Sequence, residues 1–132
     1  MTRIFRIDGE AVRARLREWA HSLGQSDANV LGVVLFGSFA RGDYTAASDA
    51  DILVILQESP YRFDERIPLY RPRQLGVSAD VFPYTLEEAK QSLRERWGVV
   101  PIAIQEGEVL YCVRSFLRDL LGVGKSSESE VP

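Results

Sequence analysis

Two short apolar runs constrain the fold of this chain more than any other feature of its sequence. Hydrophobic side chains fill almost every position of Val30–Phe36 and Asp51–Leu56, without the alternation of a strand that faces water on one side. An unbroken apolar run of this length is typical of a β-strand that is covered on both faces. A third strand is predicted over Val77–Tyr84, with Pro83 at its end or on a sheet edge because proline cannot donate to a ladder.

Amphipathic helices are predicted before and after these strands. Asp8 can cap a helix over about Glu10–Leu23, in which apolar residues recur at steps of three and four and so share one face. Thr85, followed three residues later by Glu88, has the spacing of a capping box and predicts a helix that runs to about Trp97.

The C-terminal part of the chain predicts a hairpin, a short helix and a tail. The hairpin pairs Pro101–Gln105 with Glu108–Cys112, and a closing helix follows over Arg114–Leu121. Residues 123–132 are rich in Ser and Glu and have almost nothing to bury, so we expect this tail to be disordered.

Together these elements predict one domain, residues 1–122, with an α+β fold of the two-layer α/β type. Its mixed β-sheet is expected to have about five strands, with helices packed mainly on one face. The length of 132 residues suits one domain with an adequate core. Segment Gln57–Gly76, which contains three prolines, is predicted to be the least regular part.

Charge and rare residues exclude several classes of function. With 16 Lys and Arg against 19 Asp and Glu, the net charge of −3 argues against a nucleic-acid binder, which should be basic. A nucleotide substrate stays open, because a metal ion can mediate between carboxylates and phosphates. A single cysteine and a single histidine exclude an internal disulfide and a Cys- or His-rich metal site. No signal peptide is visible, nor an apolar run of the roughly 20 residues that span a bilayer, so we expect a cytoplasmic protein without membrane association.

Three carboxylates carry the predicted chemistry. Asp49 and Asp51 stand two residues apart where an apolar strand begins, so their side chains leave the same face. Asp80 lies inside the third apolar strand, where a lone carboxylate is costly unless it has a partner. Carboxylates that converge repel one another and bind cations, and Mg²⁺ prefers such oxygen ligands while keeping positions for phosphate oxygens. We therefore predict a two-metal site for phosphoryl or nucleotidyl transfer.

A phosphate-binding turn is predicted between the first two strands. Gly37 allows the backbone to approach a ligand closely, and the hydroxyl of Ser38, at the start of a short helical turn, can bond to the same phosphate. Arg41, one turn on, can reach a phosphate tail, and Gly42 lets the chain turn back. The segment is not a Walker P-loop, because no Gly-Lys-Ser/Thr follows.

The spacing of these residues resembles a known family. Gly37-Ser38, followed after ten residues by Asp49-Ala50-Asp51, is similar to the Gly-Ser…Asp-x-Asp signature of the DNA polymerase beta-like nucleotidyltransferase superfamily. The surrounding residues resemble its minimal nucleotidyltransferase (MNT) branch, and Asp80 resembles the third carboxylate of that family. The resemblance is strong over residues 30–84.

The resemblance implies an enzyme that moves a nucleoside monophosphate, typically AMP from ATP, to an acceptor hydroxyl. Asp49 and Asp51 would hold two Mg²⁺ ions. Asp80 would complete the site of the ion that activates the acceptor hydroxyl and would assist its deprotonation.

On the phosphate side, the resemblance implies that Gly37 and Ser38 hold the β- and γ-phosphates of the nucleoside triphosphate. Arg41 would steady the triphosphate, and pyrophosphate would leave.

The resemblance also implies a partner. Small MNT proteins are similar to the antitoxins of HEPN/MNT toxin–antitoxin pairs, in which the MNT protein binds a small helical HEPN ribonuclease and can place AMP on a toxin tyrosine. A homo- or hetero-oligomer is open on this basis. Two alternatives stay open: an antitoxin that neutralises its partner by binding alone, and a transferase acting on a small molecule such as an aminoglycoside. The aminoglycoside enzymes usually carry an added helical domain, and the net charge disfavours a tRNA substrate.

Four arginines in the irregular segment have no assigned role from sequence. They fit a solvated face, the mouth of a nucleotide or acceptor site, or a partner surface; they are Arg62, Arg66, Arg71 and Arg73.

Overall fold

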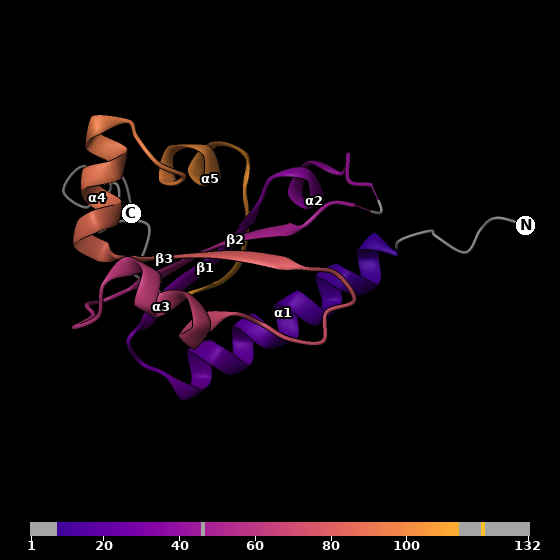
Figure 1. Cartoon of the computed structure of the whole chain (residues 1–132), viewed down its shortest axis with the longest axis horizontal. Helices are drawn as coiled ribbons and strands as arrows, with labels where there is room; N and C mark the ends of the chain where they lie inside the picture. The colour runs from indigo at the N-terminus through magenta and orange to yellow at the C-terminus, as the bar shows by residue number, and fades with distance from the viewer. Residues whose placement is uncertain (1–7, 46, 114–119, 121–132) are drawn as a thin grey trace, which may run out of the picture.

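The structure, a computed structural model, describes residues 8–45, 47–113 and 120. Helices and strands mix along the chain as expected for an α+β protein (Figure 1). In chain order the elements are α1 (Gly9–Ser26), β1 (Val30–Phe36), α2 (Ser38–Arg41), β2 (Ala50–Leu56), α3 (Phe63–Tyr70), β3 (Ala79–Thr85), α4 (Leu86–Glu95), α5 (Val100–Glu106) and β4 (Glu108–Cys112). The closing helix and the tail predicted after residue 113 lie outside the described residues, apart from Leu120.

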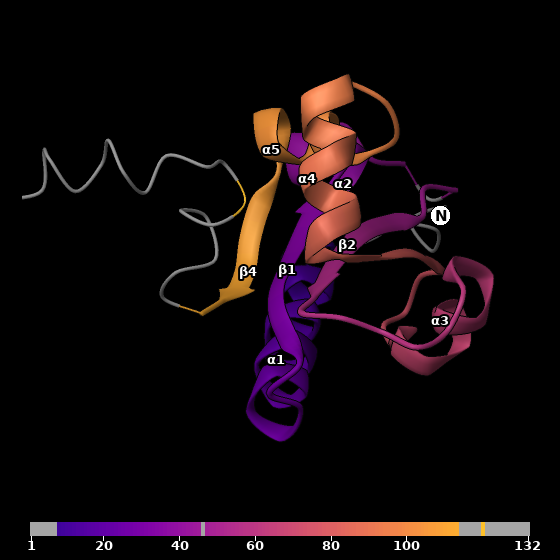
Figure 2. The ribbon, with the colours of Figure 1, turned by 90° about the vertical axis from the view of Figure 1, so that its left-hand side faces the viewer.

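The sheet is mixed and has the strand order β3-β2-β1-β4 in the described part of the chain. Strand β1 pairs antiparallel with β2 and with β4, whereas β2 and β3 run parallel. Figure 2 shows β4 at one edge of the sheet and α3 beyond the other edge, next to β3. The three predicted strands are confirmed, and the apolar runs of β1 and β2 are buried as expected. β3 is an edge strand, where Pro83 is tolerated.

The predicted five-strand count is wrong by one strand, because Val100–Glu106 forms helix α5 instead of the first arm of a hairpin. Pro101 stands in the first turn of this helix, where its missing N–H is not needed. Val100 and Ala103, three residues apart, both point into the core, which is the spacing of a helix face and not of a strand.

Helices cover both faces of the sheet, which corrects the expectation of one mainly covered face. Alternate residues of β1 and β2 enter two separate apolar clusters. One cluster joins the strands to α1, and the other joins them to α4 and α5 (Figure 1). The unbroken apolar runs follow from this arrangement, because each strand must present hydrophobic side chains in both directions.

Helix α1 begins where predicted but ends later. The carboxylate of Asp8 accepts a hydrogen bond from the backbone N–H of Ala11 at 3.1 Å, as an N-cap should. Gly24, which follows the predicted last residue Leu23, lies buried within α1, where the ring of Tyr111 takes the space a side chain would need.

Helix α3 lies in the segment predicted to be irregular. The backbone N–H of Arg62 donates to the carboxylate of Glu65 at 3.0 Å, which satisfies one free donor at the start of the helix. Arg66 then ties α3 to the end of β3, since its side chain is 5% exposed and donates to the backbone oxygen of Pro83 at 2.9 Å. This long-range anchor, which no local pattern shows, stabilises a helix that contains Pro68.

Candidate active site

The three predicted carboxylates lie at the same end of the sheet. Asp51 is the second residue of β2 and lies in register with Asp80 on the parallel strand β3. Asp49 directly precedes β2. Strand alternation places Asp51 on the same face as Leu53 and Ile55, which is the face covered by α4 and α5. The carboxylates therefore lie just beyond the apolar cluster on that face.

The carboxylates act on one another electrostatically. The pKa of Asp51 is raised above its ordinary value, first because the side chain is partly buried and then because Asp80 and Asp49 are negatively charged. Arg41 opposes this rise in the pKa, and Glu106 adds to it. A carboxylate in this position is destabilised when ionised and would gain from a cation.

Gly37 brings the turn after β1 directly against Asp51. Phe36, the last residue of β1, pairs with Asp51 across the two strands, so the next residue passes over the carboxylate. Gly37 has φ +81°, and a Cβ at this position would collide with the Asp51 carboxylate. Both the backbone conformation and the close approach therefore require glycine.

Ser38 and Arg41 are the first and last residues of the single turn α2. Gly42 ends it in the left-handed conformation, and its N–H donates to the backbone oxygen of Ser38 at 2.8 Å. The Arg41 guanidinium donates to Asp43 at 3.1 Å and to Glu106 at 3.1 Å. Arg41 thus lies near enough to Asp51 to act on its charge, but Asp43 and Glu106 share its guanidinium.

Glu106 is a site residue that sequence reasoning missed. Its carboxylate accepts a hydrogen bond from the backbone N–H of Gly37 at 3.0 Å as well as the bond from Arg41. It stands at the C-terminal end of α5, so the incorrect hairpin prediction placed it in a surface turn. No short-range signal marks it, because the contact joins residues 69 positions apart.

A cavity of about 420 Å³ opens next to two of the carboxylates. Its lining includes Asp49, Asp80 and Arg71, together with Pro72 and residues 77–79. Of the four arginines without an assigned role, Arg71 is therefore the one beside the carboxylates. A pocket of this size has room for part of a nucleotide or for an acceptor side chain.

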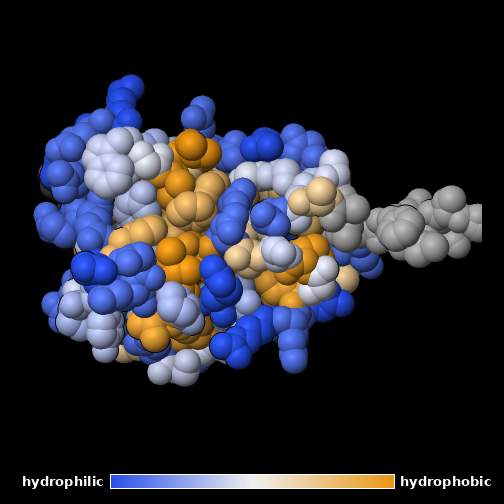
Figure 3. Space-filling model, in the orientation of Figure 1, coloured by the Kyte–Doolittle hydropathy of each residue, from blue (hydrophilic) through white to orange (hydrophobic). Residues whose placement is uncertain are grey.

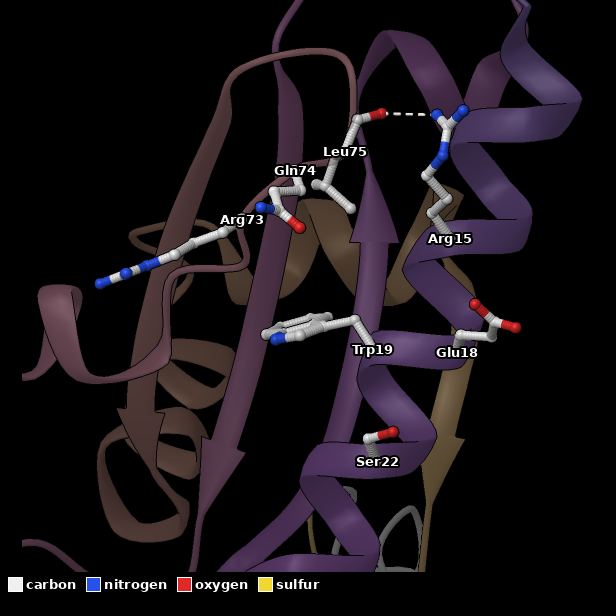
Figure 4. A pocket seen from close by; sticks show the side chains of 7 residues that line it. All are labelled: Arg15, Glu18, Trp19, Ser22, Arg73, Gln74 and Leu75. Atoms are coloured by element: carbon white, nitrogen blue, oxygen red, sulfur yellow. Dashed lines mark hydrogen bonds between the residues drawn. The ribbon is translucent and has the colours of Figure 1, made fainter.

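The other three arginines have different surroundings. Arg66 is buried and structural, whereas Arg62 is exposed and pairs with Asp64 at 3.4 Å. Arg73 lines a second cavity, of about 520 Å³, between α1 and the loop that precedes β3 (Figure 4). In that cavity the flat face of Trp19 is turned toward the loop, and Arg15 donates to the backbone oxygen of Leu75 at 2.8 Å.

A further cavity, of about 340 Å³, lies on the α4 side of the molecule. Phe63, Tyr84 and Trp97 line it together with Glu88. Trp97 is 44% exposed, so it is not a core residue. Apolar side chains reach the surface in the middle of the face shown in Figure 3, bordered by hydrophilic groups.

The donor chemistry of the carboxylate cluster suits Mg²⁺, although the ligands are not gathered. Within the described residues, no three or more His, Cys, Asp or Glu side chains converge closely enough to hold a metal ion as they stand. Carboxylate oxygens are nevertheless the ligands that Mg²⁺ prefers, and Mg²⁺ usually takes few of them because it shares its positions with substrate phosphates. The site therefore suits a metal that arrives with a phosphate ligand better than a metal bound alone.

Comparison with known proteins identifies the family. The nucleotidyltransferase domain family matches residues 16–109, which is more than half of the chain. A Methanocaldococcus jannaschii protein named “putative protein adenylyltransferase” is 34% identical over 79 residues, which cover 60% of this chain and 76% of that protein.

Solved structures share the fold. A toxin–antitoxin structure with AMP-PNP contains a chain that is 16% identical, with a TM-score of 0.51 and coverage of 89% of this chain and 90% of that one. A mutant of the toxin–antitoxin MntA-HpeT contains a chain that is 15% identical, with a TM-score of 0.51 and coverage of 95% and 92%. Among the described residues, no helix combines the length and apolarity that crossing a bilayer requires.

The fold, the family match and the relative agree, and the chain belongs to the nucleotidyltransferase domain family and is a nucleotidyltransferase enzyme.

Proposed function

We propose that this enzyme transfers AMP from ATP to a hydroxyl group on a partner protein. The observation that carries the proposal is the placement of Asp51: it lies in register with Asp80, follows Asp49 by two residues, and touches the Gly37 turn. A raised pKa at a carboxylate among like charges is typical of a functional site. Adenine as the base is supported by the adenylyltransferase name of the M. jannaschii relative.

In this proposal Asp49 and Asp51 would hold two Mg²⁺ ions, and Asp80 would complete the site of the ion that activates the acceptor hydroxyl. Bound Mg²⁺ would neutralise charge on the phosphates and lower the pKa of the acceptor hydroxyl. The repulsion that raises the pKa of Asp51 supports this assignment, because a cation between the carboxylates would relieve it. The backbone N–H of Gly37, the Ser38 hydroxyl and the Arg41 guanidinium would hold the β- and γ-phosphates.

The reaction balances without any further reactant. The acceptor oxygen forms a bond to the α-phosphorus of ATP, and the bond from that phosphorus to the oxygen bridging to the β-phosphate breaks. Pyrophosphate leaves with that electron pair, and the acceptor proton passes to Asp80 or to water. Asp80 is exposed and lines the open cavity, so a hydroxyl on another molecule can reach it.

We propose a small helical HEPN-type toxin as the partner, with a tyrosine as acceptor and the cytoplasm as the place of action. The resemblance to MNT antitoxins suggests this partner, and the toxin–antitoxin structures that share the fold support a toxin as the partner. One of those structures contains AMP-PNP, an ATP analogue, which supports ATP as the donor.

The test uses ATP labelled at different phosphates. The chain would be incubated with Mg²⁺ and a purified HEPN-type protein, with ATP carrying radioactive phosphorus at the α- or the γ-position. We expect label in the partner from the α-position only. Transfer of the γ-label would indicate a kinase, and transfer of neither label, with the partner still inhibited, would indicate an antitoxin that acts by binding alone.

A further inference from the structure

Glu106 places a carboxylate where the proposed function requires a phosphate. It accepts hydrogen bonds from the backbone N–H of Gly37 at 3.0 Å and from the Arg41 guanidinium at 3.1 Å. These two groups are the donors proposed to hold the triphosphate. Carboxylate and phosphate oxygens are equivalent acceptors for such donors, and both make short, charge-assisted hydrogen bonds with them.

We propose that Glu106 determines ligand specificity at the phosphate site: its carboxylate occupies the position of a terminal phosphate and gives way only to a ligand with more negative charge. This inference rests on the proposed function and adds a residue to it. A triphosphate or pyrophosphate accompanied by Mg²⁺ can replace the carboxylate. A ligand with no phosphate beyond the α-position has nothing to place there.

The surrounding charges support competition at this position. Arg41 is shared between Glu106 and Asp43, so two carboxylates already occupy hydrogen-bond donors of the guanidinium. Glu106 also adds its negative charge to that of the carboxylates around Asp51. A weakly charged ligand would therefore enter a site of net negative charge and find its donors occupied.

The backbone at the end of α5 is held firmly, so the side chain must move and not the helix. The N–H of Gly107 donates to the backbone oxygen of Ala103 at 2.8 Å. A Cβ at Gly107 would collide with Val34 and with the backbone of the neighbouring strand, so α5 packs closely on β1 at this point. The Glu106 side chain is 26% exposed, which gives it a route into solvent by rotation about its own bonds.

The chain offers a matched control in Asp43. Asp43 also pairs with Arg41, at 3.1 Å, but it makes no hydrogen bond with Gly37 among those that the structure describes. An Asp43→Asn change therefore removes a negative charge from the same arginine and leaves the Gly37 donor occupied. An effect specific to the occupied phosphate position must be larger in Glu106→Gln than in Asp43→Asn.

The experiment measures binding of ATP, pyrophosphate and AMP by calorimetry, with Mg²⁺, to the wild type, Glu106→Gln, Glu106→Ala and Asp43→Asn. Circular dichroism checks that each variant is folded. We expect both Glu106 variants to bind ATP and pyrophosphate about tenfold more tightly, the order of effect of one competing charge-assisted hydrogen bond. The gain for AMP should be less than about twofold, and Asp43→Asn should gain only a small part of the effect.

Three results would overturn the inference. They are unchanged or weaker binding of ATP and pyrophosphate by both Glu106 variants, an equal gain for AMP, and an equal gain in Asp43→Asn. If the proposed function is wrong, the result looks different, because then neither the wild type nor any variant binds ATP. If the Glu106 variants bind ATP and the wild type does not, the result supports both the inference and the proposed function.

Discussion

Strand β3 has one group of charged residues at each end. The charges at its C-terminal end are paired with opposite charges, whereas those at its N-terminal end lie beside like charges. At the C-terminal end, the buried guanidinium of Arg66 bonds to both carboxylate oxygens of Glu88, at 2.7 and 3.0 Å, and to two backbone oxygens. At the N-terminal end, Asp80 lies beside Asp51 and Asp49.

The pKa values show the difference. The pKa of Glu88 is lowered, chiefly by its hydrogen bond to Arg66. The pKa of Asp51 is raised, chiefly by burial and then by Asp80 and Asp49. In the first group the buried charge of Arg66 has a partner, and removing that partner would destabilise the fold. In the second group the carboxylates repel one another, so the rest of the fold must hold them in place. Such an arrangement is typical of a site that binds a cation and a phosphate.

The largest expected effect comes from removing charge at the N-terminal end. Asp49→Asn combined with Asp51→Asn should lower the rate of AMP transfer by more than about a hundredfold. Even mutation of a residue that only hydrogen-bonds to a metal ligand typically lowers metal affinity or activity by about 10–100-fold. The melting temperature should stay the same or rise, because the substitution removes repulsion. Transfer assays and thermal unfolding measure the two effects.

Asp64→Asn is the control for that double variant, because Asp64 is exposed on α3 and its only described ion pair is with Arg62. Its transfer rate should match the wild type. Appreciable activity in the double variant, or a large fall in its melting temperature, would contradict the assignment of these carboxylates.

The next largest effect is expected at the C-terminal end. Glu88→Gln leaves the buried Arg66 charge without a full partner and weakens the bond to the Thr85 N–H. We expect a loss of about 2 kcal/mol in the free energy of unfolding, below the range of about 3–5 kcal/mol for a fully buried pair because Glu88 is 40% exposed.

Denaturant unfolding tests this loss, with Glu87→Gln as the neighbouring exposed control, for which a change within about 0.5 kcal/mol is expected. Transfer per folded molecule should be unaltered in Glu88→Gln. Equal stability in the two glutamine variants would mean that Arg66 and Glu88 contribute nothing as a pair.

A smaller effect should distinguish a metal bound alone from a metal bound with nucleotide. The carboxylates are not gathered for metal binding, so Mg²⁺ alone should raise the melting temperature little. Mg²⁺ with ATP at ten times its dissociation constant should stabilise the wild type by about 1.4 kcal/mol. The Asp49→Asn, Asp51→Asn double variant should lose that gain, and thermal unfolding with each addition is the measurement. A full gain from Mg²⁺ alone would show a preformed metal site.

The smallest expected effects are two pH dependences of opposite sign. Because the folded pKa of Glu88 is below its ordinary 4.5, its stabilisation is complete above that pH and is lost as pH falls through the folded value. Because the folded pKa of Asp51 is above its ordinary 3.8, its ionisation costs stability, and the cost appears as pH rises through the folded value.

Unfolding of Asp51→Asn and Glu88→Gln between about pH 3 and 7 tests both signs. Asp51→Asn should be more stable than the wild type at pH 7 and should lose that advantage in acid. Glu88→Gln should be less stable at pH 7 and should approach the wild type in acid. If the stability difference between variant and wild type changed with pH in the same direction for both variants, the distinction between the two clusters would be lost.

The same contrast shows how far sequence could predict this molecule. The central strands were predictable because an apolar run buried on two faces is a local signal. The placement of Asp49, Asp51 and Asp80 at one end of the sheet was predictable from a motif, and the register of β2 with β3 explains why Asp51 and Asp80 lie next to each other. Their roles in transfer stay predictions.

What sequence could not predict depends on contacts between distant residues. The segment around Val100 is rich in apolar residues that suit a strand or a helix, and packing of Val100 and Ala103 into one cluster decides for a helix. Glu106 reaches Gly37 only because that helix ends there. In the same way, Arg66 became a buried anchor through contacts with β3 and α4, which its neighbours in sequence do not indicate.

The central claim is that Asp49 and Asp51 hold the metal ions that position the triphosphate. The most direct test is a crystal structure with Mn²⁺ and α,β-methylene-ATP, which cannot release pyrophosphate, using anomalous scattering to locate manganese. The account predicts manganese within coordination distance of oxygens of both carboxylates, with the terminal phosphates against the Gly37 turn. Nucleotide bound with no manganese at Asp49 or Asp51, or bound elsewhere on the molecule, would contradict it.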